Sequence, residues 1–182
     1  MNRTGRTLSL GCLLLLLPLL ALAGGNTLLI PAPGACSLNA AAPDLAEAMA
    51  ACQQAAENGD VQAEYELGEF YYDGKRTERD LHQALKWFEQ ASLKGHAPSQ
   101  YRLGMMFFRG EAVPANSVQA YIILKMAAVN GSDEAMDSAD MISAQMPREQ
   151  LDLASQVLGQ IFRNYLLELQ SNDSLSPFAP QP

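Results

Sequence analysis

The sequence predicts an all-α fold, an α-solenoid of antiparallel helical hairpins that ends in a long C-terminal capping helix. The first observation is a period of 36 residues that relates Gly59, Gly95 and Gly131. The second is that helix-start and helix-stop residues recur within each period. A period of this length is typical of solenoids, in which stacking buries apolar faces that a single hairpin leaves exposed.

The period covers two full units with half a unit on each side. We place the full units at about residues 60–95 and 96–131, and the half units at 44–59 and 132–146. Identical residues 36 positions apart include Tyr65 and Tyr101, Leu67 and Leu103, Gly68 and Gly104, Gly74 and Gly110, Ala84 and Ala120, and Ala91 and Ala127. Small residues at repeated positions indicate places where paired helices approach closely.

Each full unit is predicted to contain two helices. Asp80 and Asn116 precede the second helix of their units, and a glutamine follows each of them three residues later. This spacing fits a capping box, in which a short polar side chain accepts an orphan N–H and the glutamine reaches back. Gly59, Gly95 and Gly131 stand where these second helices should end, as C-terminal glycines do.

A last helix is predicted over residues 147–170. Pro147 suits the first helical position, where its missing N–H costs nothing. An apolar face then recurs at helical spacing: Leu151, Ala154, Leu158, Ile161, Phe162, Tyr165 and Leu169. Residues 171–182 are rich in Ser, Asn, Asp and Pro, and we expect them to form a disordered tail.

A second stripe on the same helix consists of Leu153, Val157 and Ile161. It has two interpretations. Both stripes can belong to one wide buried face, because a closing helix lies across the preceding hairpin. Alternatively, the second stripe is a surface for self-association or for a partner. The wide buried face is the preferred interpretation.

Residues 1–23 are predicted to be a cleavable secretory signal. A basic start leads into an apolar run over residues 8–23, which ends in the small-x-small sequence Ala21-Leu22-Ala23. This run is short for a membrane span, which needs about 20 apolar residues, so a cleaved signal is preferred and an uncleaved anchor is the alternative. A lipid-attachment site at Cys12 is disfavoured because most of the apolar run follows this cysteine. Residues 24–43 are predicted to be a linker.

The charge of the chain limits the classes of partner. The whole chain has a net charge of −8, and loss of the signal leaves 10 basic and 20 acidic residues, a net charge of −10. Nucleic-acid binding needs surface patches of Lys and Arg that contact the phosphate groups. Anionic membranes likewise attract basic surfaces. The composition therefore argues against both.

Two cysteines, Cys36 and Cys52, remain after the predicted cleavage. Exported compartments are oxidising, so such a pair usually forms a disulfide. In the chain-entropy model a loop of about 16 residues contributes about 3 kcal/mol. A redox-active pair is the alternative, but the spacing is not C-x-x-C. We therefore predict a structural disulfide that attaches the lead-in, the segment before the first helix, to that helix.

The repeat resembles the Sel-1-like family, a branch of the tetratricopeptide-type solenoids. The family motif runs A-x3-L-G-x2-Y-x2-G, a short loop, then D-x3-A-x2-W and A-x3-G. The first unit matches at Ala63, Leu67, Gly68, Tyr71, Gly74, Asp80, Ala84, Trp87, Ala91 and Gly95. The second aligns Ser99, Leu103, Gly104, Phe107, Gly110, Asn116, Ala120, Ile123, Ala127 and Gly131. The resemblance covers about residues 46–146 and implies a right-handed solenoid.

The departures from the motif concern local geometry. Arg76 and Ala112 stand where the family has its second loop glycine, and Ile123 stands where it has tryptophan. They put the loop geometry and local packing in doubt, but not the fold.

The resemblance further implies that the leading helix of each hairpin lines the concave side. The candidate protein-binding groove consists of residues off the packing positions of these helices: Glu66, Glu69, Phe70, Asp73, Arg102, Met105, Met106, Arg109, Met141 and Ile142. Methionine suits surfaces that accept varied apolar partners, and a segment bound in a groove is a recurring recognition mode. The alternative is that these methionines fill the core.

No catalytic, metal or cofactor site is predicted. His82 lies in the first turn of a helix and His96 at a helix start, and neither stands in a cluster of metal-ligand residues. G-x-S-x-G, a phosphate-binding loop and S-x-x-K are all absent. Glu66 and Glu69 share a helix face, as paired acid–base groups would, but solvated helix charges are the preferred interpretation.

The preferred function is an exported, periplasmic or secreted, protein-interaction module that binds an envelope protein or peptide. Two alternatives remain. One is a small-molecule or cell-wall binder, or an enzyme like the β-lactamases linked to cysteine-rich members of the family. The other is a structural subunit of an envelope complex.

Overall fold

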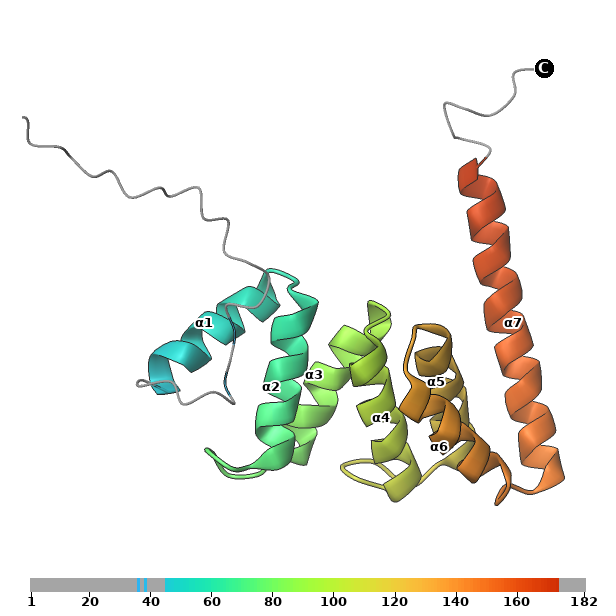
Figure 1. Ribbon diagram of the computed structural model, residues 1–182, viewed down its shortest axis with the longest axis horizontal. Coiled ribbons are helices and arrows are strands. Elements are labelled where there is room, and N and C mark those ends of the chain that lie inside the picture. The colour runs from blue at the N-terminus through green and yellow to red at the C-terminus, as the bar shows by residue number, and fades with distance from the viewer. Residues whose placement is uncertain (1–35, 37, 39–44, 174–182) are drawn as a thin grey trace, which may run out of the picture. The chain divides into compact units, whose positions relative to one another are not determined.

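The computed structural model describes residue 36, residue 38 and residues 45–173, with side chains as far as Glu168. Within these residues it contains seven helices and no strand (Figure 1), so the predicted all-α fold is confirmed. The helices are α1 (Leu45–Glu57), α2 (Val61–Asp73), α3 (Leu81–Leu93), α4 (Ala97–Arg109), α5 (Ser117–Val129), α6 (Asp133–Ser143) and α7 (Arg148–Asp173). The predicted signal, most of the predicted linker and residues 174–182 lie outside the described residues.

The helices pack as stacked hairpins. In each full unit the leading helix packs against the trailing one, α2 against α3 and α4 against α5. The units join because α3 packs against α4 and α5 packs against α6. The helices from α1 to α6 therefore pack mainly against their neighbours in chain order, as in a solenoid, whereas α7 packs against α5.

The trailing helices begin at the predicted caps. Oδ1 of Asp80 accepts hydrogen bonds from the N–H groups of His82 and Gln83, both at 3.0 Å. The backbone N–H of Asp80 donates to the carbonyl of Tyr71 on the leading helix, at 3.0 Å. Asn116 caps α5 in the same way, and its N–H donates to the carbonyl of Phe107. The cap N–H groups are thus satisfied by the leading helix, and Oε1 of Gln119 accepts instead from Nδ2 of Asn116, at 3.1 Å.

The glycines predicted to end the trailing helices take the expected conformation. Gly59, Gly95 and Gly131 have φ angles of 90°, 81° and 101°. Residues with a side chain rarely adopt these left-handed backbone angles, whereas glycine adopts them freely. The same turn therefore recurs after α1, α3 and α5.

Two repeated glycines allow each hairpin to close. A Cβ atom on Gly68 of α2 would overlap the ring of Phe88 on α3. A Cβ atom on Gly104 of α4 would lie 2.7 Å from Cγ of Leu124 on α5. Phe88 and Leu124 are fully buried, so the large side chain of one helix fills the space left by the missing side chain of the other.

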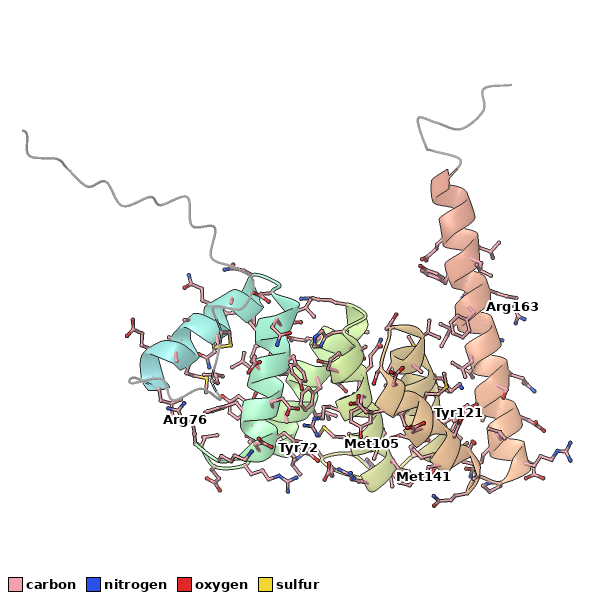
Figure 2. All side chains as sticks on the ribbon, viewed as in Figure 1. Tyr72, Arg76, Met105, Tyr121, Met141 and Arg163 are labelled. Carbon is pink, nitrogen blue, oxygen red and sulfur yellow. A yellow bond between two sulfur atoms is a disulfide. The ribbon has the colours of Figure 1, made fainter. Side chains whose placement is uncertain are left out.

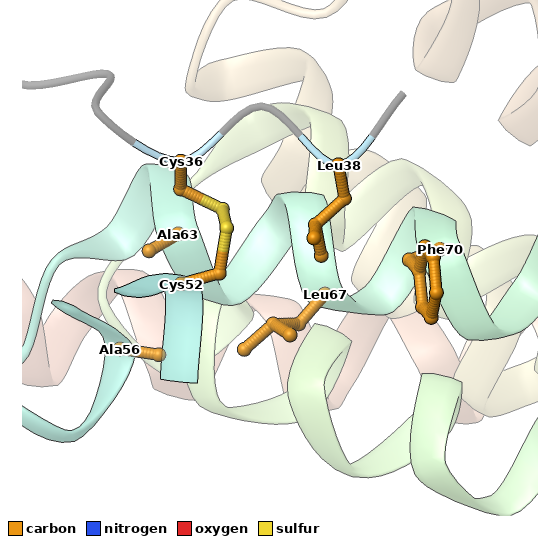
Figure 3. Packing of buried hydrophobic residues seen from close by; sticks show 7 residues of the cluster. All are labelled: Cys36, Leu38, Cys52, Ala56, Ala63, Leu67 and Phe70. Carbon is orange, nitrogen blue, oxygen red and sulfur yellow. A yellow bond between two sulfur atoms is a disulfide. The ribbon is translucent and has the colours of Figure 1, made fainter. Parts of the chain in front are cut away.

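A disulfide and a buried leucine cover the N-terminal end of the solenoid. Cys36 is bonded to Cys52 of α1, as predicted. Leu38 is fully buried in a cluster with Leu67 and Phe70 of α2 (Figure 3).

The described lead-in residues are also tied to the first hairpin loop. Nη1 of Arg76 donates to the carbonyl of Leu38 at 2.9 Å. Arg76 stands where the family motif has its second loop glycine, so this departure has a structural use. The lead-in is therefore attached to α1 by a covalent bond and to the loop after α2 by a hydrogen bond.

Helix α7 does not bury the wide apolar face that was preferred from the sequence. Ala154 and Leu158 are buried and α7 packs against α5. In contrast, Phe162, Tyr165 and Leu153 are 36%, 57% and 52% exposed. The preferred interpretation is therefore wrong for these residues. The predicted Leu169 lies outside the residues whose side chains are described, and the helix continues to Asp173.

Among the described residues, none of the helices combines the length and the apolar character needed to cross a membrane.

Candidate protein-binding surface

The structure divides the ten predicted groove residues into two groups. Phe70, Met106 and Ile142 are buried in the three apolar clusters that form the core. For Met106 the core interpretation is therefore correct, and these three side chains offer no surface to a partner. Leading helices have neighbours on several sides, because α4 packs against α2, α3 and α5. A larger part of each leading helix is consequently buried than the repeat pattern indicates.

Two of the other seven residues are also buried. Glu69 and Met105 are 9% exposed each, and Met105 belongs to the core cluster with Ala120 and Leu124, so the core interpretation is correct for Met105 too. Arg109 and Met141 are exposed. Figure 2 labels Met105 and Met141, which lie on α4 and α6. The remaining members are partly exposed: Glu66, Asp73 and Arg102.

An ion pair connects the leading helices of the two full units. Nε of Arg102 lies 2.6 Å from Oε1 of Glu69, and Nη2 lies 2.8 Å from Oε2. Two parallel hydrogen bonds fix the plane of the guanidinium as well as its position. Burial lowers the pKa of Arg102, but the hydrogen bonds and charge of Glu69 outweigh burial and raise it. Arg102 is therefore a fixed cation between α2 and α4.

Tyr72 sits at the centre of a second polar cluster. The guanidinium carbons of Arg79 and Arg102 lie 5.1 and 5.4 Å from the centre of its ring. Its hydroxyl donates to Oε2 of Glu111 at 3.0 Å and accepts from Nη1 of Arg109 at 3.2 Å. Cation–π contacts of this kind are favourable by about 0.5–1 kcal/mol at exposed sites. The cluster ties the loop ends of the two units together.

A hollow of about 440 Å³ opens between the N-terminal halves of α2, α4 and α6. Its lining comes from all three leading helices and the turn before α6: Tyr65, Ala97, Pro98, Tyr101, Arg102, Gly131, Ser132 and Glu134. Of the residues predicted from the sequence, only Arg102 lines it. The signal in the sequence for the other lining residues is the 36-residue spacing of Tyr65 and Tyr101.

The hydroxyl of Tyr65 stays protonated at neutral pH. Burial, helped by the nearby charge of Glu69, raises the pKa of this phenol above its usual value of 10.0. Tyr65 therefore presents the hollow with an apolar ring and a neutral hydroxyl.

His96 is a structural neighbour of the hollow. Its Nδ1 lies 2.9 Å from Oγ of Ser99, and its ring centre lies 5.1 Å from that of Tyr65. Burial lowers the pKa of His96, although the charge of Glu64 acts against this. The described residues contain no group of three His, Cys, Asp or Glu side chains suited to a metal ion.

The fold and this surface define a class of protein, the α-helical repeat solenoids with a hollow on their leading helices. More particularly, the Sel1 repeat family model matches residues 61–96 and 97–132. Sel1 repeats generally mediate protein–protein interaction, and the family is typically a non-enzymatic scaffold. No curated protein matches the chain in sequence.

Two solved structures show the same architecture. A Sel1 repeat protein from Oxalobacter formigenes is 35% identical, with a TM-score of 0.53, over 54% of this chain and 29% of that one. The protein c5321, a protective antigen of uropathogenic Escherichia coli strains, is 23% identical, with a TM-score of 0.61, over 75% of this chain and 29% of its own. The chain thus spans less than a third of the length of either protein.

Proposed function

We propose that this chain binds a segment of another protein in the hollow between α2, α4 and α6. The observation that carries the proposal is that Tyr65, Tyr101 and Arg102 line one hollow of about 440 Å³. Tyrosine and arginine are the side chains most enriched among residues that dominate binding energy, because they combine apolar area with polar atoms.

The lining indicates the chemistry of the bound segment. The two tyrosine rings and Pro98 suit an apolar side chain. Glu134 is exposed at the start of α6 and adds a negative charge. Arg102 is already paired with Glu69, so it orients the lining more than it attracts an acidic partner. We therefore expect a segment with an apolar anchor and a neighbouring amine, guanidinium or amide donor.

We further propose that this binding takes place in the cell envelope or outside the cell. The Cys36–Cys52 disulfide supports this location, because structural disulfides persist in oxidising compartments and are rare in the cytosol. The signal-like pattern of residues 1–23 agrees with it. Fractionation of cells would test the location, and chain found only in the cytosol with free thiols would contradict it.

The binding experiment compares three forms of the tagged chain in an envelope extract. They are the wild type, a hollow variant with Tyr101→Ser and Glu134→Arg, and a control with Leu93→Asp. Leu93 is 89% exposed at the end of trailing helix α3 and does not line the hollow. Circular dichroism must show that all three forms are equally helical.

We expect a protein retained by the wild type and the control to bind the hollow variant at least about tenfold more weakly, as loss of a central anchor usually costs that much. Titration of the purified partner measures this ratio. Equal affinity for all three forms would place the binding surface elsewhere. Retention of no protein at all would contradict the interaction function itself.

A further inference from the structure

The apolar stripe on α7 continues beyond the part of the helix that is buried. It starts at Ala154 and Leu158, which are 0% and 8% exposed. One and two turns later it reaches Phe162 and Tyr165, which are 36% and 57% exposed, with Leu166 beside them at 56%. Residues at such spacings share one face of a helix. The same face therefore has a covered half and an uncovered half.

The difference in helix length explains why half of the face is uncovered. α7 has 26 residues, about 39 Å at a rise of 1.5 Å per residue, whereas its packing partner α5 has 13 residues, about 20 Å. The second half of α7 therefore extends past α5 (Figure 1). A helix pair can bury an apolar stripe only as far as both helices reach.

The exposed half of α7 carries little charge. Its charged residues are Arg163, Glu168 and Asp173, a net charge of −1, in a chain with a net charge of −8. Two copies of an acidic protein repel each other over most of their surfaces. Between Gln160 and Glu168 the two charges cancel, and the apolar stripe carries no charged side chain.

The other end of the solenoid is closed within the described residues. Leu38 covers α2, the disulfide holds Cys36 to α1, and Arg76 donates to the carbonyl of Leu38. Head-to-tail contacts would need two different, complementary surfaces and would build filaments. One self-complementary surface instead closes as a two-fold symmetric dimer. A single uncovered apolar face among the described residues therefore favours a dimer.

We propose that the second half of α7 is the interface of a homodimer, formed by an antiparallel pair of α7 helices from two copies of this chain. With the two-fold axis between Phe162 and Tyr165, Phe162 of one copy packs beside Tyr165 of the other. The interface continues the stripe already buried by α5. It is separate from the hollow on α2, α4 and α6, so a dimer presents two hollows.

The test measures the mass of the full chain in solution as it is purified from an exporting host. Light scattering and sedimentation over a range of concentrations are applied to the wild type, Tyr165→Asp and Leu167→Asp. Tyr165 and Leu167 are 57% and 62% exposed. They lie on nearly opposite sides of the helix, so Leu167→Asp is a matched control for charge and exposure.

We expect the wild type and Leu167→Asp to have twice the mass that each shows in denaturant. Tyr165→Asp should have the single-chain mass at the same concentration, with unchanged helical circular dichroism. The N-terminus is identical in all three forms, so association through it would not distinguish them.

Three results would overturn the proposal. The first is a wild type that stays monomeric at every concentration. The second is a Tyr165→Asp variant that dimerises as well as the control. The third is a monomer that binds neutral lipid vesicles and loses this binding with Tyr165→Asp, because the stripe would then face a membrane.

Discussion

Glu64 and Gln100 occupy the same position in the two units, 36 residues apart, and both are buried. Gln100 accepts from Nδ2 of Asn130 at 2.8 Å and donates from Nε2 to the carbonyl of Ser92 at 3.1 Å. Glu64 accepts from Nζ of Lys94 at 2.7 Å. Lys94 corresponds to Asn130, so an ion pair in one unit replaces an amide pair in the next.

The ion pair between Glu64 and Lys94 uses only one of the two carboxylate oxygens of Glu64. Oε2 of Glu64 is buried and has no hydrogen-bond partner among the described residues. Ala56 is the counterpart of Ser92, and its carbonyl, like that of Ser92, accepts from the glycine that ends the turn. A carboxylate oxygen cannot donate to a carbonyl, whereas the amide of glutamine can.

We therefore predict that Glu64→Gln is tolerated and that the reverse change, Gln100→Glu, is not. Glu64→Gln should leave the free energy of unfolding within about 1 kcal/mol of the wild type, because a new amide donor offsets the loss of an ion pair with a partly exposed lysine. Gln100→Glu should cost about 1–3 kcal/mol, because it removes a buried donor. Urea unfolding measures both. Equal losses for the two variants would show that the positions are not equivalent.

At the scale of one helix, glycine has two opposite effects in this chain. Gly104 of α4 faces Leu124 of the partner helix, whereas a Cβ atom on Gly159 of α7 would have its nearest side-chain neighbour, Nη1 of Arg163, at 3.9 Å. Alanine is better than glycine in a helix interior by about 1 kcal/mol when nothing obstructs its side chain. The packing surroundings therefore decide the sign of the substitution.

We predict that Gly104→Ala destabilises the protein by about 1–3 kcal/mol, because its methyl group would force Leu124 out of its packed position. Gly159→Ala should stabilise the protein by up to about 1 kcal/mol. Thermal and urea unfolding of the two variants measure the difference. Stabilisation by both changes would mean that α4 and α5 can separate without cost, and would contradict the close approach at Gly104.

For the molecule as a whole, the period of 36 residues was sufficient to predict the hairpins, because caps, turn glycines and close-packing glycines are local signals. Asp80, Gly95 and Gly104 show this, since each acts where the repeat placed it. The binding surface was harder to predict, because burial depends on how many helices surround a leading helix. Phe70 was therefore assigned to the groove although it is 3% exposed.

The exposed half of α7 was missed for a related reason. An apolar stripe shows that a face can be buried, but it does not give the length of the helix that covers it. The hollow was missed because Tyr65 and Tyr101 fit both packing and binding, and only the arrangement of three leading helices distinguishes the two.

The last prediction concerns how far the effect of the disulfide extends. Units of a solenoid interact only with their neighbours, so a change at one end weakens that end most. Cys36 and Cys52 close a loop at the N-terminal end, where Leu38 is buried with α2. Replacement of both cysteines by serine should cost up to about 3 kcal/mol in the chain-entropy model. We expect hydrogen exchange to accelerate in α1 and α2 and to remain nearly unchanged in α5 and α6. The wild type in reductant should reproduce this pattern, which separates the effect of the bridge from that of the serine side chains. Uniform acceleration across all helices would show instead that the array unfolds as one cooperative unit, and the stabilisation by the bridge would then be shared by the whole solenoid.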